Sequence, residues 1–152
     1  MDTRSPQQRR RIIQSVKQKG TTSELVVRRL LHGAGYRYRL HRKGLPGRPD
    51  IVFGKRRKVI LVHGCFWHAH GCSKGKAPKS KLDYWGPKLA QNVERDAKNV
   101  RDLVNAGWQV LTVWECETRD PARLLLVLRD LWVNKENDRH IETSWLECRI
   151  EN

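Results

Sequence analysis

The chain has 152 residues, which is enough for one domain with a hydrophobic core and too few for two domains of ordinary size. Its 31 Lys and Arg outnumber 16 Asp and Glu, giving a formal net charge of +15. Such an excess favours nucleic acid as the partner over a membrane surface, because no basic amphipathic helix with an apolar face is evident. The sequence shows neither a membrane-spanning run nor a secretory signal, so we expect a protein of the cytosol or nucleoid.

The sequence of residues 1–40 predicts a basic arm, a helix and a strand. Residues 1–20 are polar and basic, with only a weak helical pattern. A helix is predicted over 23–32, where apolar residues recur at helical spacing, and Thr21 and Glu24 have the spacing of a capping box. Residues 36–40 alternate in polarity and predict an edge strand, which a turn-rich basic loop follows.

A β-hairpin, a long loop and a helix are predicted next. The hairpin strands cover 50–53 and 58–63, and the second is apolar on both faces, as is typical of a central strand. Residues 64–86 show little periodicity, and loops of that length are usually functional, cross-linked or disordered. A helix is predicted over 87–106, because its first residue is a proline and apolar residues follow at helical spacing.

A strand over 108–115 and a helix that begins at Pro121, with Asp120 as its N-cap, complete the pattern. The helix between strands 58–63 and 108–115 implies that these two strands are parallel. One mixed α/β domain follows from this order of elements. We expect a basic arm at 1–20, a core domain at 21–133 and a C-terminal tail without a clear pattern at 134–152.

The long loop carries Cys65, His70 and Cys72 with the spacing C-x4-H-x-C. Thiolates and imidazoles are ligands that Zn²⁺ prefers. Four cysteines in a chain without an export signal also favour metal or free thiols over disulfides. Cys116, at the end of a predicted strand, is the better candidate for a fourth ligand, and Cys148 is the alternative. Such a site would have no open position, so its zinc would be structural.

Four separated segments resemble the very short patch repair (Vsr) endonucleases, in the order and spacing of that family. They are LPGRPDIVF (45–53), VHGCFWHAHGC (62–72), NVERD (92–96) and WQVLTVWEC (108–116). The resemblance implies a restriction-endonuclease-like fold with a PD-(D/E)xK type site. It implies an enzyme that nicks DNA on the 5′ side of a thymine mispaired with guanine, the lesion left when 5-methylcytosine deaminates. Mg²⁺ would be its catalytic cofactor and Zn²⁺ its structural metal.

The resemblance also implies the roles of the site residues. The strand 58–63 lacks the Glu-x-Lys that most PD-(D/E)xK nucleases carry, and histidines stand nearby instead. A neutral imidazole can take a proton from water near pH 7, while Mg²⁺ neutralises charge on the phosphate. The implied set is Asp50 and the Val62 backbone carbonyl as Mg²⁺ ligands, Glu24 and His63 as partners of metal-bound waters, His68 as the base and Asp96 as the acidic partner of the histidines.

Each of these residues also has an ordinary structural interpretation. Asp50 alone could be a solvated turn residue, and Glu24 could serve only the capping box. Asp96 could belong to a solvated ion pair on its helix. His63 or His68 could ligate zinc in place of His70, although the resemblance favours His70.

Three aromatic residues are candidates for contact with DNA. Phe66, Trp67 and Trp85 match family residues that form a wedge entering the duplex beside the mismatch, and core packing is their alternative role. Basic residues would contact phosphates, and we name Arg10 and Arg48 among them. The resemblance further implies a monomer with functional links to a DNA cytosine methyltransferase and to mismatch-repair proteins. Two other functions stay open: a zinc-stabilised protein that binds the lesion without cleavage, and a nuclease of the same fold with another target.

Overall fold

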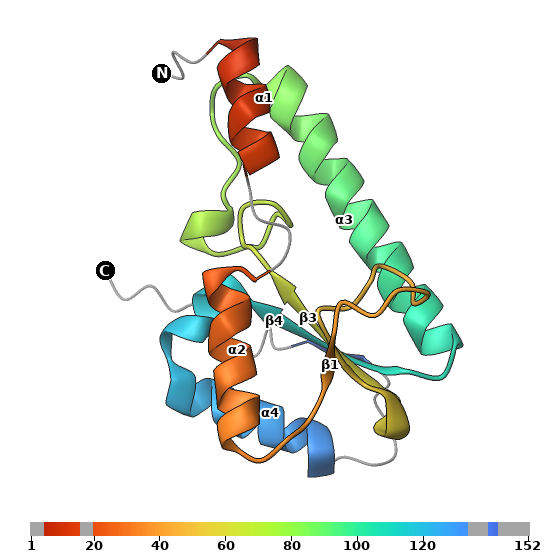
Figure 1. Cartoon of the computed structure of the whole chain (residues 1–152). Coiled ribbons are helices and arrows are strands. Elements are labelled where there is room, and N and C mark those ends of the chain that lie inside the picture. Colours follow the sequence, from red (N-terminus) through yellow and green to blue (C-terminus); the bar gives the residue numbers. More distant parts are fainter. Residues whose placement is uncertain (1–4, 16–19, 134–139, 143–152) are drawn as a thin grey trace.

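The computed structural model describes residues 5–15, 20–133 and 140–142, with side chains described within 5–15 and 20–129 (Figure 1). Among these residues no helix is long and apolar enough to cross a membrane. The helices and strands follow in the order α1 (Pro6–Ser15), α2 (Thr22–Gly33), β1 (Arg39–Leu40), β2 (Ile51–Phe53), β3 (Lys58–His63), α3 (Leu82–Asn105), β4 (Gln109–Trp114), α4 (Pro121–Val133) and β5 (His140–Glu142).

A five-stranded mixed sheet in the order β1-β2-β3-β4-β5 forms the centre of the molecule. Strands β1, β2 and β3 pair antiparallel, whereas β3, β4 and β5 pair parallel. This confirms the predicted mixed α/β class and the parallel pair joined by a helix. His63 lies opposite Trp114 in the β3–β4 register, so the segments that follow these two strands leave the sheet at the same edge.

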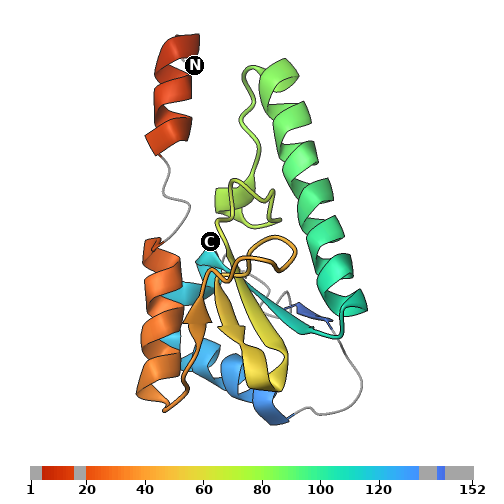
Figure 2. The same cartoon turned by 45° about the vertical axis from the view of Figure 1, so that its right-hand side comes forward.

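Helices cover both faces of the sheet (Figures 1 and 2). On one face, Val27 of α2 and Leu124 of α4 join a buried cluster with alternate residues of the central strands, such as Ile60. On the other face, Leu103 of α3 packs in a second cluster with Val59 and other strand residues. Alternation along β3 thus gives each face its own core, which explains why that strand is apolar on both sides.

The structure corrects two details of the predicted elements. Helix α3 begins at Leu82, five residues before the predicted start, so Pro87 lies inside the helix and not at its first position. Aromatic contacts of Trp85 with the preceding loop accompany this extension, and local sequence does not reveal them. Strand β1 has two residues where five were expected. The predicted arm contains α1, and β5 lies in the predicted tail and pairs with β4.

Candidate functional site

Asp50 lies directly before β2, beside the end of β3. Its Oδ2 accepts a hydrogen bond of 2.7 Å from the backbone N–H of Val62. Burial raises the pKa of Asp50 to about 6, and the nearby carboxylate of Glu24 adds to that rise, although the Val62 N–H lowers it. A carboxylate that is costly to ionise beside a second carboxylate is a good candidate ligand for a cation.

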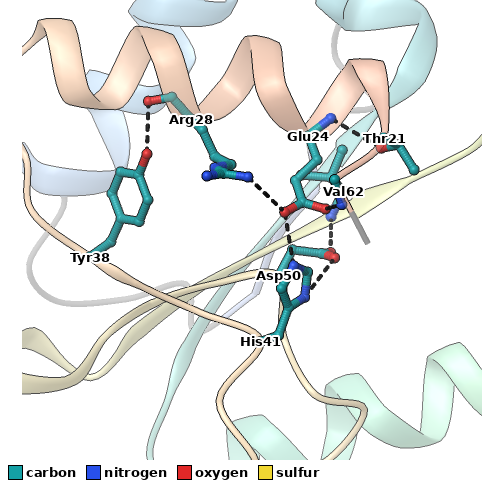
Figure 3. A network of polar contacts seen from close by, with 8 residues as sticks. Thr21, Glu24, Arg28, Tyr38, His41, Asp50 and Val62 are labelled. Carbon is teal, nitrogen blue, oxygen red and sulfur yellow. Dashed lines mark hydrogen bonds and ion pairs between the residues drawn. The ribbon is translucent and has the colours of Figure 1, made fainter. Parts of the chain in front are cut away.

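Glu24 is buried in the first turn of α2, where Thr21 is the N-cap, and it faces Asp50 (Figure 3). Its backbone N–H donates to Thr21 Oγ1 at 3.2 Å, and its Oε2 accepts from the Gly20 N–H at 2.9 Å. Its Oε1 lies 3.8 Å from Arg28 Nη1. The backbone N–H of Glu24 therefore makes the predicted capping bond with Thr21, while its side chain bonds Gly20 in place of Thr21 and lies in the site.

His41 completes this group, and sequence reasoning missed it. Its Nε2 lies 2.9 Å from Glu24 Oε1, and its Nδ1 lies 3.8 Å from Asp50 Oδ1 (Figure 3). The only signal was its position: Leu40 pairs with Ile51, so the next residue outward lies beside Asp50. We call Glu24, His41 and Asp50 the carboxylate cluster; one ligand atom from each lies within 4.8 Å of those of the others.

A histidine cluster, formed by His63, His68 and Asp96, begins at the next residue along β3 after Val62. The His63 and His68 rings stack at 3.9 Å, and Asp96 Oδ2 of α3 contacts His68 Nδ1. Burial lowers the pKa of His63 to about 3, with a further contribution from His68. Burial would raise the pKa of Asp96, but the hydrogen bond with His68 outweighs it and the pKa falls. Asp96 is thus an ionised partner that orients the His68 ring.

A thiol cluster, formed by Cys65, His70, Cys72 and Cys116, lies beyond the end of β3. The candidate ligand atoms all lie within 4.8 Å of one another, and Cys116 Sγ is 3.6 Å from His70 Nδ1. Tetrahedral zinc with bonds of about 2.3 Å to sulfur and about 2.0 Å to nitrogen would place such a pair about 3.5 Å apart. Burial raises the pKa of the Cys65 thiol to about 11, so a thiolate there calls for a cation.

The donor set and the spacing of the thiol cluster fit zinc. His70, and not His63 or His68, lies with the thiols, and its ring stacks on Trp114 at 4.2 Å. Cys148, the alternative fourth ligand, lies outside the described residues. That these residues bind a metal remains a prediction.

An aromatic cluster of Phe66, Trp67 and Trp85 lies on the loop and on the first turn of α3. Ring centroids are 5.1 Å apart for Phe66–Trp67, 5.3 Å for Phe66–Trp85 and 6.0 Å for Trp67–Trp85. Asn92 of α3 donates a 2.8 Å hydrogen bond to the Trp67 carbonyl and so ties the loop to the helix. None of the three aromatic residues belongs to the buried core clusters.

Comparisons with known proteins match this chain to one family. A sequence model of one family, described as DNA mismatch endonuclease Vsr, matches residues 1–74. The chain is 53% identical over 130 residues to the type II nicking enzyme V.XorIIP of Xanthomonas oryzae pv. oryzae, which covers 86% of this chain and 96% of that protein. It is 40% identical over 112 residues to the DNA mismatch endonuclease Vsr of Escherichia coli, with 74% and 72% covered. This chain belongs to the Vsr family.

The match to the Vsr family model covers most of the candidate site residues but not all of them. It includes the whole carboxylate cluster, both clustered histidines and three members of the thiol cluster. Asp96 and Cys116 lie beyond it, and the folded structure adds them: α3 carries Asp96 to His68, and β4 carries Cys116 to Cys65. The structure therefore brings Asp50 together with Glu24 and Val62, and Cys65 with His70, Cys72 and Cys116, whereas His63 groups with His68 and Asp96. The chemical roles of these residues remain predictions.

The two basic residues named for this Vsr-family chain lie on the surface, apart from the buried clusters. Arg10 is exposed on α1 and Arg48 is exposed two residues before Asp50. Arg48 has a φ of +46°, a left-handed conformation that costs free energy in a residue other than glycine. Arg9, next to Arg10, lies over the Tyr84 ring at 5.7 Å, so α1 lies close to the beginning of α3. Contact of these residues with DNA remains a prediction.

Proposed function

We propose that this Vsr-family endonuclease nicks DNA on the 5′ side of the thymine in a T·G mispair, by Mg²⁺-dependent hydrolysis of the phosphodiester. The observation that carries the proposal is the position of Asp50 and Glu24 beside Val62 of β3, with His63 as the next residue of that strand and the His68–Asp96 pair against His63. A cation site next to a candidate base is what hydrolysis of a phosphodiester requires. Relatives named as a mismatch endonuclease and as nicking enzymes support the reaction class.

Asp50 and the backbone carbonyl of Val62 would hold Mg²⁺, and Glu24 and His63 would orient water around it. Oxygen ligands suit this cation, which keeps several waters in protein sites. When bound, Mg²⁺ supplies positive charge that stabilises the negative charge developing on the phosphate. The low pKa of His63 keeps its ring neutral, so it can accept a hydrogen bond from water.

His68 would act as the general base. Its Nδ1 faces Asp96, which leaves Nε2 to take a proton from the attacking water. The water oxygen attacks phosphorus as this proton moves to His68, and the bond from phosphorus to the leaving sugar oxygen breaks. Asp96 would keep the ring in the required orientation and stabilise the imidazolium that forms.

The thiol and aromatic clusters would recognise the lesion. Cys65, His70, Cys72 and Cys116 would hold a structural Zn²⁺, and the loop that they fix carries Phe66 and Trp67. Insertion of the aromatic cluster beside a mispair separates one base step, which costs least where pairing is already weak. The mixed sheet flanked by helices supports a restriction-endonuclease-like interpretation of the fold.

The remaining parts of the proposal concern the partners. The net charge of +15 supports double-stranded DNA as the substrate, with Arg10 and Arg48 among the phosphate contacts. We propose a monomer that acts in the cytoplasm of a bacterium, at its nucleoid. Functional links to a DNA cytosine methyltransferase and to mismatch-repair proteins belong to the same proposal.

The test compares otherwise identical duplexes that contain a T·G, T·A or C·G pair, incubated with purified protein and Mg²⁺. We expect one nick, 5′ to the mispaired thymine, in the T·G duplex alone. Asp50→Ala should retain binding and lose nicking. Binding without nicking by the unaltered protein would instead support a lesion-binding protein, and equal cutting of all three duplexes would support a nuclease with another target.

A further inference from the structure

His41 stands between the two carboxylates of the proposed magnesium site and has no role in the mechanism so far. Its side chain is 15% exposed and its Nε2 lies at hydrogen-bond distance from Glu24 Oε1, 2.9 Å away. Its other ring nitrogen lies 3.8 Å from Asp50 Oδ1, which is too long for a direct hydrogen bond. The Nε2 of the imidazole is therefore in close polar contact with Glu24 Oε1, a buried oxygen that has no partner with hydrogen-bond geometry among the described residues, and the ring also lies near Asp50 (Figure 3).

The backbone of His41 is also tied to Asp50. Its N–H donates to the Asp50 carbonyl at 3.1 Å, one step beyond the last β1–β2 pair. Its φ of +46° lies in the left-handed region, which histidine adopts at a cost. Strained residues of this kind cluster at functional sites, where the surrounding structure holds them in place. The strain turns the chain at the end of β1, where the His41 ring meets α2.

Glu24 Oε1 has a second basic neighbour besides His41. Arg28 lies one turn further along α2, with its Nη1 3.8 Å from the same oxygen. The Arg28 carbonyl accepts a 3.0 Å hydrogen bond from Tyr38 Oη, which fixes the helix against the segment before β1. Without His41, the Glu24 carboxylate could close on the Arg28 guanidinium and turn away from Asp50. The other carboxylate oxygen, Oε2, accepts a hydrogen bond from the Gly20 N–H, so the carboxylate would rotate about this oxygen.

We propose that His41 is a positioning residue: through the close polar contact of its Nε2 with Glu24 Oε1, it keeps this carboxylate turned toward Asp50 and sets the affinity of the site for a divalent cation. The inference rests on the proposed function, because it assigns a role within the same site. Partners that hold a metal-site carboxylate in place commonly change metal affinity by about 10-fold to 100-fold when they are removed. His41 is not required as a ligand, since its Nε2 already lies against a carboxylate oxygen.

The experiment uses substitutions of His41 by Gln and by Asn to test which of its two ring nitrogens matters for cation binding. The amide nitrogen of Gln extends about as far as Nε2, which faces Glu24, whereas that of Asn extends only about as far as Nδ1. Mn²⁺ serves as the probe and is titrated into the zinc-loaded, DNA-free protein, with free Mn²⁺ measured by electron paramagnetic resonance. We expect His41→Ala and His41→Asn to weaken Mn²⁺ binding roughly tenfold or more. His41→Gln should remain within about threefold of the unaltered protein.

Two further variants identify which idea has failed. His32→Ala removes an exposed histidine at the end of α2, the helix that carries Glu24, and this variant should bind Mn²⁺ normally. Asp50→Ala should lose Mn²⁺ binding; if it does not, or if the unaltered protein binds no Mn²⁺, the proposed function is wrong. If Asp50→Ala loses binding while His41→Ala keeps it, or if His41→Gln is as weak as His41→Ala, the role of His41 is refuted. Thermal unfolding of each variant identifies loss of fold, and the Gln and Asn pair still decides if His41→Ala does not fold.

A kinetic readout distinguishes positioning from general damage. The Mg²⁺ concentration that half-saturates nicking should rise in His41→Ala by the same factor as the Mn²⁺ dissociation constant. Saturating Mg²⁺ should then recover most of the turnover, because the bound cation itself attracts Glu24 toward Asp50. A low turnover that no Mg²⁺ concentration improves would contradict a role in cation affinity.

Discussion

The carboxylate cluster and the thiol cluster lie near the same end of β3 and are built in opposite ways. The first takes Glu24 from α2 and takes His41 and Asp50 from the two ends of the loop between β1 and β2. It places two carboxylates together, and burial with this neighbouring charge raises the pKa of Asp50. The second takes three of its four members from eight consecutive residues of one loop and closes with Cys116. An open group of oxygen ligands suits a cation that exchanges water and substrate, whereas four soft ligands leave no position for either.

We therefore expect the reaction at the carboxylate cluster, where ionising Asp50 is costly. We expect a structural role for the thiol cluster, whose four ligands leave no open position. In the histidine cluster, Asp96 stays ionised while His63 stays neutral. Four substitutions test this division, one for each cluster.

Asp50→Asn should have the largest effect, and it should act in opposite directions on activity and stability. Loss of the charge removes the proposed cation ligand, so we expect nicking to fall on the order of 10³-fold. The hydrogen bond from Val62 survives, because the amide oxygen can accept it. Nicking of a T·G duplex and urea unfolding without added Mg²⁺ measure the two effects. Equal stability of the two proteins at pH 8 would mean that Asp50 carries no electrostatic cost.

The pH dependence of this stabilisation follows from the sign of the pKa shift. The pKa of Asp50 in the folded protein is about 6, above its ordinary value of 3.8. The ionised carboxylate therefore opposes folding: the cost is absent below pH 3.8, grows between 3.8 and about 6, and is complete above that. Asp50→Asn should raise the free energy of unfolding by about 1–3 kcal/mol at pH 8 and by little at pH 4.

Cys116→Ser should affect the fold first and activity only through the fold. We expect zinc content to drop from one atom per chain toward zero and the free energy of unfolding to fall by several kcal/mol. Elemental analysis and thermal unfolding measure these changes. Cys148→Ser is the matched control, since the same substitution outside the thiol cluster should leave zinc in place. If Cys148→Ser loses the zinc and Cys116→Ser keeps it, the assignment of the fourth ligand is wrong.

Asp96→Asn should separate orientation from charge within the histidine cluster. An amide can donate to His68 Nδ1, which would move the ring proton to Nε2 and block proton uptake there. We expect turnover to fall about 10²-fold with little change in the affinity for DNA. Asp102→Asn, on the same helix and paired with Lys98 at the surface, is the control and should keep full turnover. Single-turnover kinetics that leave Asp96→Asn unimpaired would remove His68 from the role of base.

Much of this arrangement could be predicted from the sequence, and the failures have physical causes. The mixed sheet and its parallel pair follow from the order of strands and helices, and both are confirmed. The start of α3 was wrong, because Pro87 fits a first turn and only tertiary contacts of Trp85 indicate the longer helix. His41 was missed, because a histidine in a turn-rich basic loop has no signal until β1 pairs with β2. The chemical roles of the site residues stay predictions.

Trp85→Ala should have the smallest effect and should leave both metal sites intact. Trp85 contacts Phe66 and Trp67, which lie in sequence between two members of the thiol cluster. The thiol cluster would therefore hold the aromatic residues in position without contacting the DNA itself. Stacking on a base is worth about 1–3 kcal/mol, so we expect roughly a tenfold loss of preference for T·G over T·A duplexes in binding. Trp85→Phe should retain most of the preference, because an aromatic ring can still stack. If Trp85→Ala keeps its zinc and still prefers T·G over T·A duplexes, Trp85 has no part in recognition of the lesion.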